Sequence, residues 1–228
     1  EAAVYTAVKS ILPGDIPANE GFFRAVTVTA PPGTIANGVL PAATAARALT
    51  GFRQVDCCFG ALAKMVPDRV GAASDGGNVG VSLGGYSADR SPFIYVDFFA
   101  GAWGGRPWAD GLQGNANLCA NLSSTSAEVT EVETPLQILT YKFIQDAMGA
   151  GKFRGGLSAE SCFIPHNVER VTHDTLSSGN ATPTAPGIMG GYPAVTNAYT
   201  FKSLPYDAAK DFAPVRLVGR SPFVIAAG

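Results

Sequence analysis

At 228 residues the chain is long enough for one large domain or two small ones with a substantial buried core. Hydrophobic residues make up 46% of it and charged residues only 15%, a composition that argues against intrinsic disorder. The formal charge is −2, there is no run of Lys or Arg, and no apolar run reaches about 18 residues, so neither a nucleic-acid partner nor a membrane span is indicated.

The first third of the chain predicts two helices and one strand. Residues 1–12 (EAAVYTAVKSIL) are rich in Ala, and the Pro-Gly pair that follows should end this helix. Residues 25–30 (AVTVTA) are strand-like and are closed by a Pro-Pro-Gly turn. The longest predicted helix runs over about 41–66, because apolar residues recur within it at spacings of three and four before a proline ends it.

From residue 70 onward the pattern changes to short strands with glycine-rich joints. Val79–Leu83 and Phe93–Phe99 are predicted to pair as an antiparallel hairpin with a longer loop. One long helix packed on a β-rich, loop-heavy body gives an α+β fold. Further strands are predicted over residues 128–133, 136–143, 159–164, 168–172, 199–202, 215–218 and 223–226.

The segment Asp75-Gly76-Gly77-Asn78 places a carboxylate and an amide on a flexible turn. The two glycines give the backbone freedom for the Asp75 and Asn78 side chains to face one substrate or ion. The alternative is an ordinary turn, because Asp and Asn favour turn positions in any case.

The segment 99–111 (FAGAWGGRPWADG) carries Arg106 and Asp110 beside Trp103 and Trp108. An Arg can hold a carboxylate or an amide carbonyl through two parallel hydrogen bonds, and aromatic rings exclude water around it. The alternative is a loop whose tryptophans cap the core, with Arg106 paired to a nearby acid.

Lys152 and Arg154 lie in a glycine-flanked turn, residues 151–156 (GKFRGG), whose backbone amides could face an anion. The turn lacks the G-x-x-x-x-G-K-[ST] pattern, so a nucleotide phosphate loop is not supported. A solvated basic turn, or a contact with a partner subunit, is the competing interpretation.

His166 and His173 are the only histidines in the chain. Seven residues apart on a strand-like segment, they could reach a common site, and His173 is retained as a candidate. The alternative is that both are polar surface or satisfied core residues. The four cysteines lack zinc-ligand spacing and are expected to be free thiols in a reduced cytosol.

Six sequence blocks follow one another in a fixed order. They are residues 15–35 (beginning DIPANEGFFRAVTVTAP), 41–56 (PAATAARALTGFRQVD), 61–69 (ALAKMVPDR), 75–78 (DGGN), 99–111 and 151–157 (GKFRGGL). Their order and approximate spacing over residues 1–202 resemble hydantoinase B-type subunits, the family of hydantoinases, oxoprolinases and acetone carboxylase-like enzymes. Subunits of that family are much longer and begin well before Glu1, so we expect this chain to be part of a larger hydantoinase B-type fold.

The resemblance implies a cytoplasmic complex with a hydantoinase A-type partner, which in many members binds ATP. Such complexes hydrolyse a cyclic amide such as hydantoin or 5-oxoproline, or carboxylate a ketone. A divalent metal is implied for the intact protein, with ligands outside this chain. The positions where we expect substrate or interface roles are Asp75, Asn78, Arg106, Asp110, Lys152, Arg154 and His173.

Residues 203–228 have a different character, and we treat them as a separate unit. The motifs LPYD and KDFAPV within them resemble a segment of periplasmic receptors of the tricarboxylate-binding type. This resemblance provides the competing hypothesis, a fragment of a carboxylate-binding receptor. A third possibility is an inactive, degenerate gene product.

Overall fold

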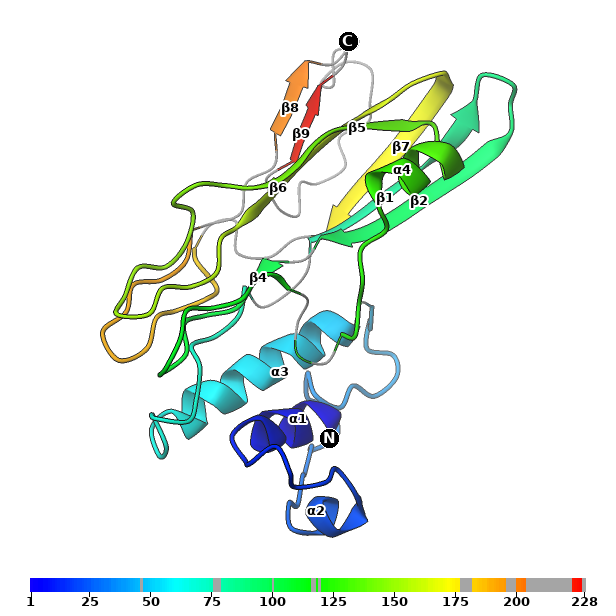
Figure 1. Ribbon diagram of the computed structural model, residues 1–228. Coiled ribbons are helices and arrows are strands. Elements are labelled where there is room, and N and C mark those ends of the chain that lie inside the picture. Colours follow the sequence, from blue (N-terminus) through cyan, green and yellow to red (C-terminus); the bar gives the residue numbers. More distant parts are fainter. Residues whose placement is uncertain are drawn as a thin grey trace.

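The computed structural model describes residues 1–45, 47–75, 79–99, 101–115, 118, 120–176, 182–195, 200–203 and 223–226. In chain order its helices and strands are α1 (Ala2–Ser10), α2 (Glu20–Arg24), α3 (Arg47–Leu62), β1 (Val79–Ser87), β2 (Pro92–Phe99), β3 (Gly101–Ala102), β4 (Gln113–Asn115), α4 (Ala127–Glu133), β5 (Leu136–Phe143), β6 (Ala159–Pro165), β7 (Val168–Leu176), β8 (Thr200–Ser203) and β9 (Phe223–Ala226). Figure 1 shows α1, α2 and α3 at one end of the molecule and the long strands at the other.

Helices α1 and α3 pack through small side chains. Ala3 and Ala7 on α1 are buried against Val55 on α3, with Phe59 and Leu62 beside them. Because alanine extends only a methyl group from the helix, the two backbones can approach closely and still exclude water. This contact fixes α3, whose polar residues face the loops described below.

The long strands form two sheets. One is antiparallel throughout, in the order β2-β1-β7, and its register sets Leu83 on β1 opposite Tyr95 on β2 and His173 on β7. The other has the order β5-β6-β9-β8, with an antiparallel β5–β6 pair and parallel pairing on both sides of β9. A short β3–β4 ladder lies between the long strands and the helices (Figure 1).

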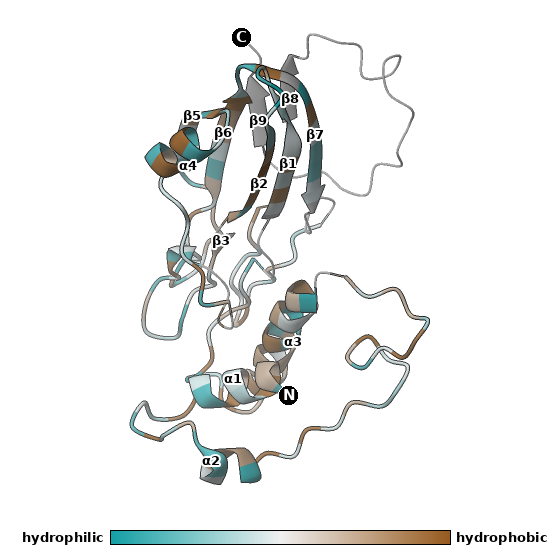
Figure 2. Ribbon diagram, turned by 90° about the vertical axis from the view of Figure 1, so that its right-hand side faces the viewer, coloured by the Kyte–Doolittle hydropathy of each residue, from teal (hydrophilic) through white to brown (hydrophobic). Residues whose placement is uncertain are grey.

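The main core lies between these two sheets, which Figure 2 shows as adjacent layers. Leu83 from the first sheet and Leu136 and Phe163 from the second are almost completely buried. The Tyr95 and Phe163 rings meet edge to face across the interface, with their centroids 6.4 Å apart. Burial of each large side chain contributes about 1.5–3 kcal/mol to the free energy of unfolding.

Most predicted elements are confirmed to within a few residues. These are the first helix, the β1–β2 hairpin, and the strands expected at 136–143, 159–164, 168–172, 199–202 and 223–226. The long helix is confirmed but shorter than expected, because residues 41–45 are not helical and a turn follows Leu62. The strand expected at 215–218 lies outside the described residues.

Two predicted strands are wrong. Residues 25–30 form neither helix nor strand, and no strand in the described part of the chain pairs with them, so apolar residues alone did not make a strand there. Residues 128–133 belong to helix α4, whose N-terminus is capped by Ser126 through a 3.4 Å hydrogen bond from the Val129 amide. A Ser cap followed by Glu residues is a helix-start signal that outweighed the β-branched residues.

Within the described ranges, no helix combines the length and the apolar character that crossing a membrane requires.

Candidate functional site

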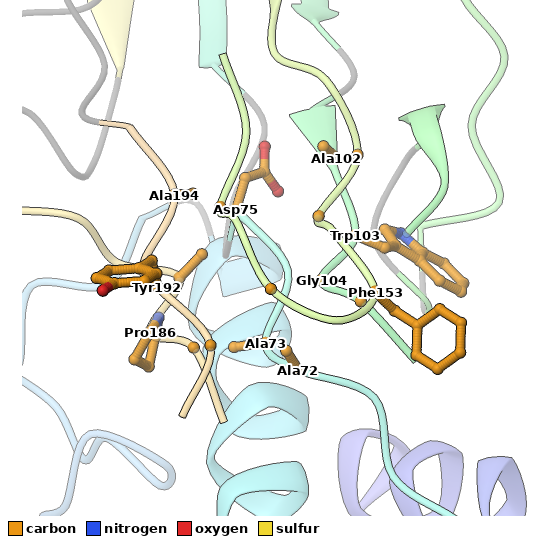
Figure 3. Close-up of a pocket in the computed structure, with 18 of the residues that line it drawn as sticks. Ala72, Ala73, Asp75, Ala102, Trp103, Gly104, Phe153, Pro186, Tyr192 and Ala194 are labelled. Atoms are coloured by element: carbon orange, nitrogen blue, oxygen red, sulfur yellow. The ribbon is translucent and has the colours of Figure 1, made fainter. Parts of the chain in front are cut away.

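Four chain segments enclose a cavity of about 650 Å³. They come from residues 67–75, 101–107, 141–161 and 184–195. Figure 3 shows Trp103 and Phe153 on one side of this cavity, Tyr192 and Pro186 on the other, and Asp75 between them. A cavity of this size, with mostly apolar walls and a few polar groups, suits a small organic molecule.

Backbone hydrogen bonds join the four segments to one another. The segment 72–75 pairs with 102–105, that segment in turn bonds to Gly156, and Ala150 bonds to Tyr192. The loops thus form one layered wall in which main chain contacts main chain. The bonds are Ala72 N to Gly105 O (2.9 Å), Asp75 N to Ala102 O (3.0 Å), Gly156 N to Trp103 O (2.9 Å) and Tyr192 N to Ala150 O (2.8 Å).

Two glycines permit this close packing. A methyl group on Gly104 would lie 2.5–2.6 Å from the Cβ, C and O atoms of Ala72, which is too close for atoms not bonded to one another. A methyl group on Gly101 would collide with the carboxylate of Asp75. The glycines of segment 101–105 therefore determine both how near the walls come and where the Asp75 side chain fits.

Other residues hold Asp75 in place through hydrogen bonds to its main-chain atoms. Its amide donates to Ala102 O, and its carbonyl accepts from Arg53 Nη2 at 3.1 Å and from Thr184 Oγ1 at 3.0 Å. Asp75 lies on the cavity wall, and its role in a site stays a prediction. Asn78, its predicted companion, lies outside the described residues, so their joint role stays a prediction.

Arg53 and Asp56 on α3 bind the segment that contains Asp75. The Asp56 carboxylate accepts hydrogen bonds from the Ser74 amide at 3.0 Å and from the Ser74 hydroxyl at 3.0–3.2 Å, and Arg53 Nη1 lies 3.8 Å away. Burial raises the pKa of Asp56, while the Ser74 hydrogen bonds and Arg53 act in the opposite direction. Neither Arg53 nor Asp56 was predicted as a site residue, because the sequence marks them only as polar positions three apart on a helix.

Arg106, Asp110 and Arg154 form one hydrogen-bonded group. Arg106 donates from Nε and Nη2 to the main-chain carbonyl of Asp110, at 3.1 and 2.8 Å. The Asp110 carboxylate pairs instead with Arg154, whose Nε lies 3.2 Å from Oδ2. All three groups are partly exposed, and an ion pair at the surface contributes at most about 1 kcal/mol. The alternative interpretation paired Arg106 with a nearby acid, and in the structure Arg106 bonds to the main-chain carbonyl of Asp110 and not to its carboxylate.

Lys152 also lines this cavity. Its side chain is exposed, and Nζ lies 5.4 Å from the centre of the Phe153 ring. A cation over an aromatic face gains about 0.5–1 kcal/mol at an exposed position. Lys152 therefore adds a positive charge to the cavity lining, opposite in sign to that of Asp75.

His173 is not among the residues that line the cavity. It lies on β7, and its Nε2 is 2.8 Å from Thr175 Oγ1. Burial lowers the pKa of His173 to about 4, which nearby Asp174 partly opposes. His166 is exposed in the turn between β6 and β7, so the two histidines do not share a site with the cavity residues.

The described residues do not form an all-protein cage for a metal ion. Nowhere in the described part of the chain do three His, Cys, Asp or Glu side chains come together in a way that could hold one. Asp68 and Asp75 are the carboxylates that line the cavity, and two are too few for a protein cage. Of the cysteines, Cys57, Cys58 and Cys162 are free thiols, and Cys119 lies outside the described residues.

The known proteins that this chain resembles in sequence include two enzyme subunits. The chain is 32% identical over 164 residues to the B-type subunit of a putative D-/L-hydantoinase from Pseudomonas sp. (strain NS671), an alignment covering 70% of this chain and 27% of that protein. It is 33% identical over 149 residues to the beta subunit of caprolactamase from Pseudomonas jessenii, covering 61% of this chain and 25% of that protein. The chain therefore spans about a quarter of the length of these curated relatives.

Two solved structures share the fold. The ATP-dependent caprolactamase from Pseudomonas jessenii matches with a TM-score of 0.63 and 22% identity, over 87% of this chain and 34% of that chain. A nucleotide-free acetone carboxylase matches with a TM-score of 0.52 and 25% identity, over 64% of this chain and 19% of that chain. The predicted mixed fold of helices and strands is confirmed.

The family model of hydantoinase B/oxoprolinase matches residues 1–218. This match runs into the segment 203–228, whose resemblance to periplasmic receptors finds no support in these comparisons. The division at residue 202 stays a prediction, since residues 204–222 lie outside the described residues. With nearly its whole length matched, the chain belongs to the hydantoinase B/oxoprolinase family.

Proposed function

We propose that the chain is part of the B-type subunit of an ATP-dependent enzyme that opens cyclic amides, and that the cavity around Asp75 takes the substrate ring. The observation that carries the proposal is the family match over residues 1–218. Two of the relatives are named for a hydantoinase and a caprolactamase, and both of these names refer to cyclic amides.

The chemistry of the cavity supports a cyclic amide over a ketone. Lactams and hydantoins carry a ring N–H, which can donate to the Asp75 carboxylate, and their CH₂ groups suit the apolar walls at Trp103 and Tyr192. A ketone has no donor to offer. Ketone carboxylation is the second candidate because a solved relative is an acetone carboxylase.

The partners and cofactors follow from the same relatives. Two structural neighbours are ATP-dependent by name, and two sequence relatives are named as subunits. We infer that a hydantoinase A-type subunit completes the enzyme and binds ATP, and that any divalent metal is held by residues other than those described. The free thiols agree with a cytoplasmic location.

Binding and turnover test the proposal separately. Calorimetry or ligand-observed NMR with ε-caprolactam, hydantoin and acetone would test the cavity of this chain directly. Turnover would be measured in a complete B-type subunit containing this sequence, with an A-type partner, ATP, bicarbonate and divalent metal. We expect the cyclic amides to bind and to be opened, and acetone to do neither.

The variant Asp75→Asn tests the role assigned to the carboxylate. Loss of a charge-assisted hydrogen bond should weaken lactam binding about ten- to a hundredfold. Asp89→Asn is the matched control, since Asp89 is exposed in the turn between β1 and β2. Equal affinity in the wild type and Asp75→Asn would contradict the proposed site, and carboxylation of acetone without ring opening would favour the second candidate.

A further inference from the structure

One side chain of α3 bridges two walls of the cavity. Arg53 Nη1 donates to the carbonyl of Thr184 at 3.2 Å, and Nη2 donates to the carbonyl of Asp75 at 3.1 Å. Thr184 and Asp75 belong to different wall segments, 184–195 and 67–75, and both residues line the cavity. A single guanidinium therefore fixes the spacing between these two segments.

The same contacts set the orientation of Asp75. Its carbonyl accepts from both Arg53 Nη2 and Thr184 Oγ1, and its amide is bound to Ala102 O. When both polar atoms of a residue's main chain are fixed, the direction of its Cα–Cβ bond is fixed as well. The Asp75 carboxylate then occupies the space that Gly101 leaves open.

The bridge is itself held in place. The Arg53 side chain is 29% exposed and that of Asp56 only 10%, so water competes weakly for the 3.8 Å contact between them. Asp56 also binds Ser74, the residue directly before Asp75, through that residue's amide and hydroxyl. A planar guanidinium donates along two fixed directions, which the single ammonium of a lysine cannot reproduce.

We propose that Arg53 is a positioning residue, which joins segments 67–75 and 184–195 so that the Asp75 carboxylate faces the ligand. The inference rests on the proposed function, because it takes the cavity as the substrate site. Arg53 acts through Asp75 and the Thr184 segment, and it does not itself line the cavity.

A double-mutant cycle on the full chain tests whether Arg53 acts through Asp75. With ε-caprolactam as the probe, Arg53→Lys should weaken binding about tenfold in the wild-type background and less than about twofold in the Asp75→Asn background. Arg24→Lys is the matched control, since Arg24 is exposed on α2 and pairs with Glu20 of the same helix at 3.2 Å. Equal losses in both backgrounds, or no loss in either, would overturn the assignment.

Amide hydrogen exchange gives a readout that needs no ligand. Arg53→Lys should speed exchange of the Asp75 and Tyr192 amides, one in each joined segment, by about tenfold, while strand amides of the sheets keep their rates. Arg53→Gln is a second variant, which also lacks the guanidinium and should speed exchange of the same two amides. It keeps the test valid if Arg53→Lys fails to fold. If these two amides exchange as in the wild type, Arg53 does not join the segments.

The two measurements separate the two ideas. If the wild-type chain fails to bind any cyclic amide while Arg53→Lys speeds amide exchange in both segments, the substrate assignment is wrong and Arg53 still joins the segments. If the wild type binds ε-caprolactam and Arg53→Lys binds it equally well, Arg53 is not a positioning residue and the substrate assignment is kept.

Discussion

Between the two sheets, Leu83, Leu136 and Phe163 have almost no exposed surface, and they contact one another through side chains. Around the cavity, by contrast, main chain lies against main chain, where Gly104 leaves no room for a methyl group beside Ala72 and where the Tyr192 amide donates to Ala150 O. The sheet layer is thus stabilised mainly by buried apolar area, and the cavity wall mainly by hydrogen bonds between loops.

This difference predicts opposite sensitivities to side-chain size. Removing atoms between the sheets leaves a void that the dense core cannot fill, whereas adding atoms between the loops forces hydrogen-bonded backbones apart. Substitutions of the first kind should lower the free energy of unfolding and leave the affinity of the folded protein for a ligand unchanged. Those of the second kind should impair both.

Phe163→Ala should have the largest effect. Phe163 is fully buried and meets Tyr95 across the sheets, so its truncation should cost about 3–5 kcal/mol of the free energy of unfolding. Urea denaturation followed by circular dichroism measures this loss. Ile94→Ala is the control, since Ile94 is 79% exposed on β2 and its truncation should change stability by less than about 0.5 kcal/mol. Similar losses for the two variants would contradict the assignment of the core.

Gly104→Ala should have an intermediate effect. Its methyl group would lie 2.5–2.6 Å from atoms of Ala72, so the segments must separate at a cost of about 1–3 kcal/mol. Lactam binding should weaken as well, because both segments line the cavity. Denaturation and calorimetry on the same protein measure the two effects.

The control for Gly104→Ala is Gly60→Ala on α3. Apart from its own chain neighbours and the backbone of α3, no atom of the described residues lies within 4 Å of a methyl group added there, and alanine favours a helix, so this variant should gain up to about 1 kcal/mol. A gain of stability at both positions would show that the cavity wall accommodates added atoms, contrary to the contrast between the two regions.

The sheet region was the easier of the two to predict from the sequence. Strand β2 is rich in aromatic and β-branched residues at its buried positions, such as Tyr95 and Phe99, and at its exposed positions, such as Ile94 and Val96. The strand could therefore be recognised from its local composition. Helix α4 was missed because its cap at Ser126 was overlooked beside Val and Thr residues that also suit strands. The recognition of β2 and the failure to recognise α4 both depend on residues that are close together in the sequence.

The cavity could be predicted only in part. Glycine-rich segments around residues 75, 104 and 151 were recognised as candidates, and the structure brings all three to one cavity. The role of Arg53 could not be inferred, since its partner Thr184 lies 131 residues away in the sequence. Its value as a bridge arises from tertiary packing, and periodicity marked it only as a polar position on a helix.

One titratable group in the sheet region provides the smallest test of the comparison. Burial lowers the pKa of His173 to about 4 from its ordinary value of 6.5. Between these values the unfolded chain binds more protons than the folded one, so the free energy of unfolding should rise with pH. The stabilisation is complete above pH 6.5 and is lost as the pH falls toward 4.

His173→Asn should flatten that pH dependence. Since His173 is only partly buried, we expect a difference of about 1–2 kcal/mol between pH 4 and pH 6.5 in the wild type, and a smaller difference in the variant. Urea denaturation at several pH values measures it, with His166→Asn, at an exposed position, as the control.

No histidine is among the described residues that line the cavity, so protonation of His173 should loosen the sheets first. If acid instead speeds amide exchange at Asp75 before it does at Leu83, the two regions are not independent, and a shared network must connect them.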